Sequence, residues 1–127
     1  MGEFMRKKKL VPDKIIASPA TRATQTAELF KEGGGFETEI EFDRRIYEAS
    51  PSNWRQIVSE LPDSAKKVML VGHNPGMEGF IRFLTGEYER MPTAAVALIE
   101  LDLKHWSDIG EHCCSLYKVY RPREMMN

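Results

Sequence analysis

The stretch VMLVGHNPGMEGFI, residues 68–81, holds the features that decide the fold. With Lys67 before it, the apolar run to Val71 indicates a strand buried on both faces, as in a parallel sheet. A short loop, Gly72-His73-Asn74-Pro75-Gly76, follows, and apolar residues then recur at helical spacing at positions 77, 80, 81 and 84. A buried strand that leads through a short loop into a helix is typical of an α/β protein. The stretch also sets a histidine where strand and helix meet.

The same alternation of strand and helix extends along the rest of the chain. Strands are predicted at residues 14–17, 38–42, 67–71, 94–103 and 116–120. Helices are predicted after Ser18 as far as Gly33, from Ser50-Pro51 to Pro62, and over about 10 residues after the His73 loop. The pattern predicts an α/β fold, a three-layer sandwich with a mainly parallel sheet. With 127 residues, the chain is expected to form a single domain over 1–127.

Charge and composition narrow the classes of partner. Lys+Arg number 18 and Asp+Glu 19, so the net charge of -1 gives no reason to expect nucleic acid or a membrane surface as a partner. No apolar run approaches a membrane span, and no signal-peptide core is visible. The adjacent Cys113 and Cys114 form a poor disulfide framework, so free thiols and a cytoplasmic location are expected.

Two loops are candidates for chemistry, because ligands in α/β sheets bind beyond the carboxyl ends of strands. One loop spans residues 17–22 and the other 72–76, and each precedes a helix whose N-terminus attracts an anion. Arg22 adds a planar fork suited to phosphate oxygens, and His73 adds a donor that can be charged near neutral pH. The structural alternatives stay open: Ser18 as a helix cap, Arg22 as a solvated residue, and His73 as a turn residue.

Several segments resemble those of the histidine phosphatase superfamily. SPATRATQTAE, residues 18–28, resembles its S-x-x-x-R-A-x-Q-T-A-E segment. VGHNPG, residues 71–76, resembles its second-histidine segment and, with LTG at 84–86, is most similar to the SixA-type phosphohistidine phosphatases. The segments IYEAS at 46–50, MPTA at 91–94 and RPRE at 121–124 agree with this likeness. The resemblance covers nearly the whole chain.

The resemblance implies a phosphatase that takes phosphate from phosphohistidine, or from another phosphorylated side chain, through a phosphohistidine enzyme intermediate. It implies that Arg22 clamps the phosphoryl group and His73 donates a second hydrogen bond, with Ser18 and Asn74 shaping the phosphate-binding loops. Glu48 is the candidate proton donor, or else a solvated residue at a helix entry. No metal and no other cofactor are expected, because cationic side chains neutralise the phosphoryl group. The expected substrate is a phosphorylated protein or a small phosphoester.

One segment of that family has no counterpart in this sequence. Members begin with a strand ending in Arg-His-Gly or Arg-His-Ala, whose histidine is the nucleophile. The three histidines here are His73, His105 and His112, and the last two are interpreted as surface or packing residues. We therefore expect an N-terminally truncated domain, or alternatively a non-catalytic phosphate-binding or interaction module. Without a first strand, the strand at 67–71 would keep an open edge, which predicts a homodimer or strand exchange.

Overall fold

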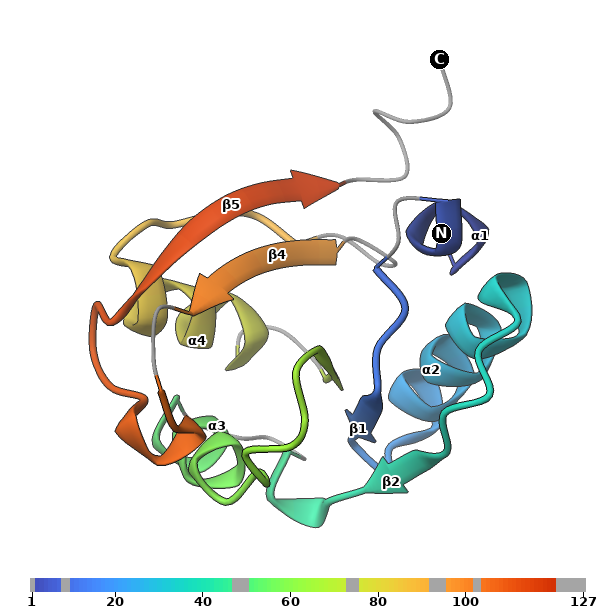
Figure 1. Ribbon diagram of the computed structural model, residues 1–127, viewed down its shortest axis with the longest axis horizontal. Coiled ribbons are helices and arrows are strands. Elements are labelled where there is room, and N and C mark those ends of the chain that lie inside the picture. Colours follow the sequence, from blue (N-terminus) through green and yellow to red (C-terminus); the bar gives the residue numbers. More distant parts are fainter. Residues whose placement is uncertain are drawn as a thin grey trace. The chain divides into compact units, whose positions relative to one another are not determined.

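The structure, a computed structural model, describes residues 2–7, 10–46, 51–72, 76–91, 96–101 and 104–120. These residues fall into two compact units, which Figure 1 colours along the sequence. The first unit comes from the described parts of 1–48 and 64–73, and the second from those of 49–63 and 74–127. Across the described ranges, no helix is long and apolar enough to span a membrane.

A parallel sheet of three strands forms the centre of the first unit. The strands are β1 (Lys14–Ala17), β2 (Ile40–Phe42) and β3 (Val68–Val71), in the order β2-β1-β3. Both neighbours run parallel to β1, which is buried along residues 15–17 as a central strand should be. The α/β fold and its parallel strands are thereby confirmed, and β1 and β3 fall where the apolar runs predict them.

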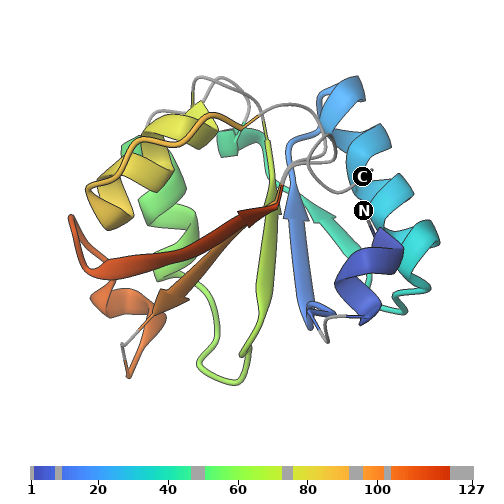
Figure 2. The same ribbon diagram turned by 90° about the horizontal axis from the view of Figure 1, so that it is seen from above.

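Helix α2 (Thr21–Gly34) packs against this sheet in Figure 2, with the short α1 (Gly2–Lys7) beside it. The small side chains of Ala23 and Ala27 lie in one buried cluster with Ala17 and Val71, so the helix approaches the sheet closely. The helix ends one residue later than predicted. Gly35 has the left-handed φ of 63° that glycine adopts without steric cost, and its N–H donates to the Glu32 carbonyl at 3.2 Å.

The second unit combines two helices with an antiparallel strand pair. It contains α3 (Pro51–Ser59), α4 (Gly76–Thr85), β4 (Val96–Leu101) and β5 (Cys114–Tyr120). Trp54 of α3 stacks on Phe80 of α4 with their ring centroids 5.5 Å apart, and α4 also contacts β5. β4 and β5 pair antiparallel in a separate two-stranded sheet. A parallel pairing would usually need a crossover helix, and the described part of the connection between them, residues 104–113, holds the one-turn η2 (Trp106–Asp108).

The cysteines differ from expectation. Cys113 and Cys114 are joined by a disulfide, so the prediction of two free thiols was wrong. The pair follows directly on the turn at residues 111–112, where His112 has a φ of 53°. The bridge joins neighbouring residues where β5 begins, a local arrangement that the general argument against vicinal bridges left out.

Candidate functional site

The three strands of the first unit end at the same level. Ala17 is in register with Phe42 on one side and with Val71 on the other. The backbone N–H of Ser18 donates to the Val71 carbonyl at 2.9 Å, and that of Asp43 donates to the Ala17 carbonyl at 3.0 Å. The segments that follow β1 and β2 therefore start side by side at the carboxyl edge of the sheet, where α/β proteins bind ligands.

Ser18 anchors the loop between β1 and α2. Its side chain is fully buried, and its Oγ accepts a hydrogen bond from the Ala20 N–H at 3.2 Å. Thr24 donates from Oγ1 to the Ser18 carbonyl at 3.5 Å. The N-cap position of α2 is Ala20, so Ser18 holds the loop rather than capping the helix directly. The loop thus enters α2 in one defined conformation.

The first turn of α2 is suited to an anion. The N-cap residue makes no side-chain hydrogen bond, and the first turn has no acidic residue. No capping side chain or carboxylate of the helix therefore competes with an anion for the first backbone N–H groups. Arg22, the second residue of the helix, is exposed. Within the ranges that the structure covers, its guanidinium has no hydrogen bond or ion pair. A phosphoryl group at this turn would meet both the helix N-terminus and a planar cation.

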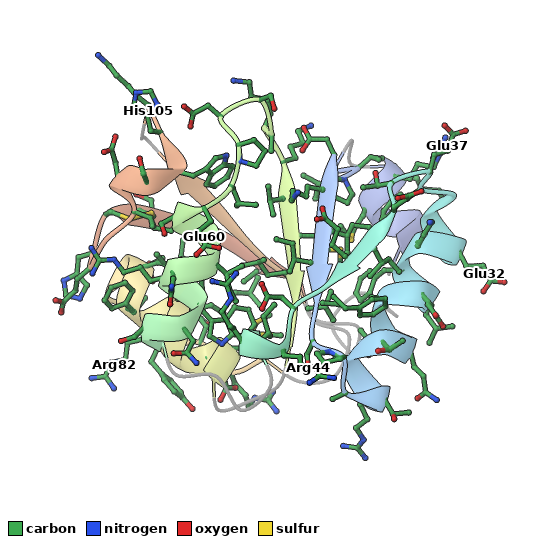
Figure 3. The ribbon with its side chains drawn as sticks, turned by 90° about the horizontal axis from the view of Figure 1, so that it is seen from below. Glu32, Glu37, Arg44, Glu60, Arg82 and His105 are labelled. Atoms are coloured by element: carbon green, nitrogen blue, oxygen red, sulfur yellow. A yellow bond between two sulfur atoms is a disulfide. The ribbon has the colours of Figure 1, made fainter. Side chains whose placement is uncertain are left out.

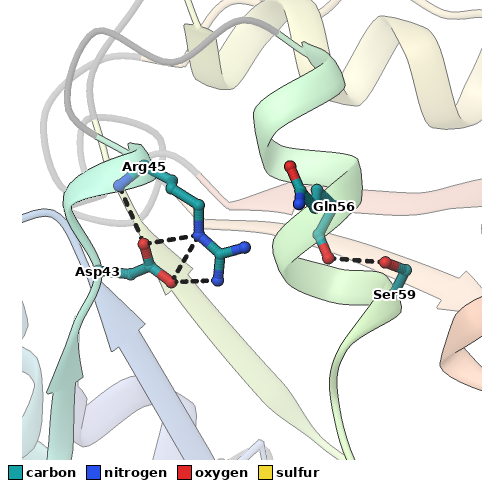
Figure 4. A network of polar contacts seen from close by, with 4 residues as sticks. All are labelled: Asp43, Arg45, Gln56 and Ser59. Carbon is teal, nitrogen blue, oxygen red and sulfur yellow. Dashed lines mark hydrogen bonds and ion pairs between the residues drawn. The ribbon is translucent and has the colours of Figure 1, made fainter.

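The segment after β2 adds an ion pair that the sequence reasoning missed. Asp43 accepts hydrogen bonds from Arg45 Nε at 3.1 Å and Nη2 at 2.7 Å, and from the Arg45 backbone N–H at 2.9 Å. Figure 4 shows these contacts between the two residues. The hydrogen bond from the Arg45 side chain is the largest reason why the pKa of Asp43 is lowered. An aspartate two residues before an arginine, directly after a predicted strand, was the available signal. The pair holds the start of η1 (Arg44–Ile46).

The remaining predicted site residues are placed only in part. Gly72 follows β3 and is half-buried at the same edge as Ser18. His73, Asn74 and Glu48 lie outside the described residues. The structure therefore brings Ser18 and Arg22 into one loop and helix start, and the roles of the other three stay predictions.

The other two histidines lie on the surface, as expected. His105 Nδ1 is 2.7 Å from Asp63 Oδ2, and both side chains are exposed. The hydrogen bond that His105 donates to the Asp63 carboxylate is the main reason why the pKa of His105 is raised. His112 is also exposed, with Nε2 4.0 Å from Glu111 Oε1. Both histidines belong to the second unit and not to the segments that follow β1, β2 or β3 in the chain.

The sequence profile described as "Histidine phosphatase superfamily (branch 1)" matches residues 2–69. No curated protein matches the chain. A structure from Nakamurella multipartitia, assigned as phosphohistidine phosphatase SixA, aligns with TM-score 0.82 and 18% identity over 95% of this chain and 77% of its own. The structure of a similarly assigned SixA from Agrobacterium tumefaciens aligns with a TM-score of 0.77 and 23% sequence identity, over 95% of this chain and 75% of the SixA chain. The structure of a protein histidine phosphatase SixA complexed with tungstate aligns with a TM-score of 0.83 and 18% sequence identity, over 98% of this chain and 78% of the SixA chain. At these identities the likeness establishes the fold.

Proposed function

Because the chain belongs to the histidine phosphatase superfamily, branch 1, we propose that it acts on phosphohistidine, or another phosphorylated side chain, and removes the phosphate. The observation that carries the proposal is the segment at residues 18–28. It lies within the range matched by the family and forms the loop and first turns at the carboxyl edge of the sheet. The solved structures of similar fold that are assigned as phosphohistidine phosphatases support the same substrate class.

In this proposal Arg22 and the first N–H groups of α2 bind the phosphoryl oxygens. Charge spreads over these oxygens as the bond to the leaving group breaks, so donors fixed in advance stabilise the transition state more than the ground state. Ser18 keeps the loop in place through its buried hydroxyl. His73 would supply a second donor, Asn74 would shape its loop, and Glu48 would protonate the leaving imidazole.

The proposed reaction transfers the phosphoryl group in two steps. A nucleophilic histidine attacks phosphorus, the bond from phosphorus to the substrate imidazole breaks, and that imidazole takes a proton. Water then attacks the phosphohistidine of the enzyme and releases phosphate. The family's nucleophile belongs to an Arg-His-Gly or Arg-His-Ala motif, which residues 1–127 do not contain. The alternative is a non-catalytic phosphate-binding or interaction module, which would carry out the binding step alone.

The test combines binding and turnover in the same 127-residue chain. We expect orthophosphate and a phosphohistidine peptide to bind, and Arg22→Ala to weaken both by about 10- to 100-fold, as loss of a charge-assisted contact does. Arg82→Ala, an exposed arginine on α4, is the matched control and should change neither affinity. Equal affinities for wild type and Arg22→Ala would refute the phosphate site.

Turnover then separates the two candidate functions. Release of phosphate from the peptide that disappears in His73→Ala supports the phosphatase. Binding without any release, together with the Arg22 effect, supports the binding module.

The outer edge of β3 supports a proposal about assembly. In the described part of the chain β3 pairs with β1 alone. An apolar strand with one open edge readily adds another strand, so we propose a homodimer or strand exchange through that edge. We also propose that the two units make up one domain, and that the protein is cytoplasmic, as its substrate class suggests.

A further inference from the structure

The turn after β2 carries a cation that the proposed phosphate contact does not use. The backbone N–H of Asp43 donates to the Ala17 carbonyl at 3.0 Å, so η1 begins level with the Ser18 loop. Figure 3 shows Arg44, the first residue of η1, at the end of the sheet where β1 leads into α2. Arg44 and Arg22 therefore lie on the segments that follow two neighbouring strands, β2 and β1.

The backbone on both sides of Arg44 is held in place. On one side Asp43 accepts the backbone N–H and the guanidinium of Arg45. On the other side Ile46 is 1% exposed, and its N–H donates to the Asp43 carbonyl at 3.2 Å. The backbone of Arg44, between these two held residues, has little freedom left to lose, so ligand binding there costs less conformational entropy.

Arg44 itself is available to a ligand. It is exposed, and among the residues the structure describes it makes no hydrogen bond or ion pair. The nearest acidic groups along the chain are already engaged: Glu41 with Lys14 Nζ at 2.6 Å, and Asp43 with Arg45 at 2.7 Å. The described segments after β1 and β2 thus carry two uncompensated guanidinium groups, those of Arg22 and Arg44.

We propose that Arg44 is a specificity-determining residue that contacts a second anion of the substrate, an acidic side chain close to the phosphorylated residue. The inference rests on the proposed function, with the phosphoryl group at Arg22. Neighbouring strands lie about 4.8 Å apart and an extended peptide advances about 3.3 Å per residue, so the segments that carry the two arginines start within the span of a few peptide residues. The substrate class is therefore a phosphorylated segment with nearby Asp or Glu.

The experiment measures the affinity of two peptides that carry a non-hydrolysable phosphonate analogue of phosphohistidine. One has Asp on both sides within three positions, and the other has Asn at the same positions. We expect Arg44→Gln to weaken only the Asp peptide, by about two- to fivefold, as for an exposed ion pair, with an effect that shrinks as salt is added. Arg44→Lys should keep most of the preference. Arg82→Gln, whose side chain points away from α4 in Figure 3, should change neither affinity.

The outcomes separate this inference from the proposed function. Equal affinity of wild type for the two peptides, or equal losses for both in Arg44→Gln, would overturn the role of Arg44. If wild type still binds orthophosphate and Arg22→Gln weakens that binding, the phosphate site is supported even though the role of Arg44 is not. If wild type binds neither peptide and does not bind orthophosphate, the proposed function fails. The role of Arg44, which rests on that function, then fails too.

Discussion

At the scale of single residues, the His105–Asp63 pair links stability to pH. Asp63 stabilises the protonated imidazole, so the pKa of His105 in the folded protein lies above its ordinary value of 6.5. A raised folded pKa means that the folded state binds the proton more tightly than the unfolded state does. The stabilisation is therefore complete below about pH 6.5 and is lost as the pH rises through the folded pKa.

We predict that His105→Gln lowers the urea midpoint of unfolding at pH 5.5 and leaves it unchanged at pH 9. The effect should be small, because both side chains are more than half exposed, at 58% and 57%. Lys104→Gln, which removes a neighbouring exposed charge, is the control and should show no such step with pH. A constant difference between wild type and His105→Gln across this range would contradict the linkage.

At the scale of elements, two adjacent residues of α2 differ sharply in burial. Phe30 is 5% exposed and Leu29 is 67% exposed. We predict that Phe30→Ala lowers the free energy of unfolding by about 3–5 kcal/mol, because it leaves a cavity. Leu29→Ala should change it by less than about 0.5 kcal/mol. Urea unfolding followed by circular dichroism measures both, and similar losses for the two variants would mean that α2 packs on a different face.

Elements whose ends are marked by local chemistry were predicted well. β1 matches residue for residue, and α4 begins at Gly76 and has the expected 10 residues. α2 extends past Gly33 because a run of three glycines offers three places to end, and the left-handed one is Gly35. The antiparallel pairing of β4 and β5 was not foreseen, because apolar runs mark strands without stating their partners or directions.

Within the candidate site, sequence reasoning identified the residues that belong to a recognisable motif. Ser18 and Arg22 were found because the loop that holds them carries a recognisable pattern and follows a buried strand. Arg44 and Arg45 were overlooked, because two exposed or half-exposed arginines in a polar segment are common. Only the register between β1 and β2 brings that segment to the edge where Ser18 lies, and register is a long-range property.

At the scale of the whole molecule, the two sides of β3 differ. The carbonyls of Lys67 and Val71 accept from Asp13 and Ser18, so alternate residues 67, 69 and 71 turn their polar backbone groups toward β1. Val68 and Leu70 turn theirs to the opposite side, where in the described part of the chain no strand pairs. Their side chains are only half-buried.

We predict that the wild-type chain forms dimers at micromolar to millimolar concentration and that Val68→Pro makes it monomeric. Proline removes an N–H on the side of β3 that faces away from β1 and spares the bonds to β1, and it is tolerated at the first position of an edge strand. Sedimentation equilibrium measures the change. Val68→Ala loses the same side chain but keeps the N–H, so it should stay dimeric. A monomeric wild type, or a dimeric Val68→Pro, would rule out assembly by strand addition.

The level ends of β1, β2 and β3 also bear on how such a site can evolve. The loops after them hold the candidate ligand contacts, whereas the hydrogen bonds from Ser18 to Val71 and from Asp43 to Ala17 hold the sheet. Mutations in the loops can change which substrates bind while the hydrogen bonds of the sheet stay intact. An insertion or deletion within β1 would shift Ser18 and Asp43 relative to each other and reverse the faces of its side chains. Lineages can therefore vary in the composition of these loops far more freely than in the length of the strand that bears them.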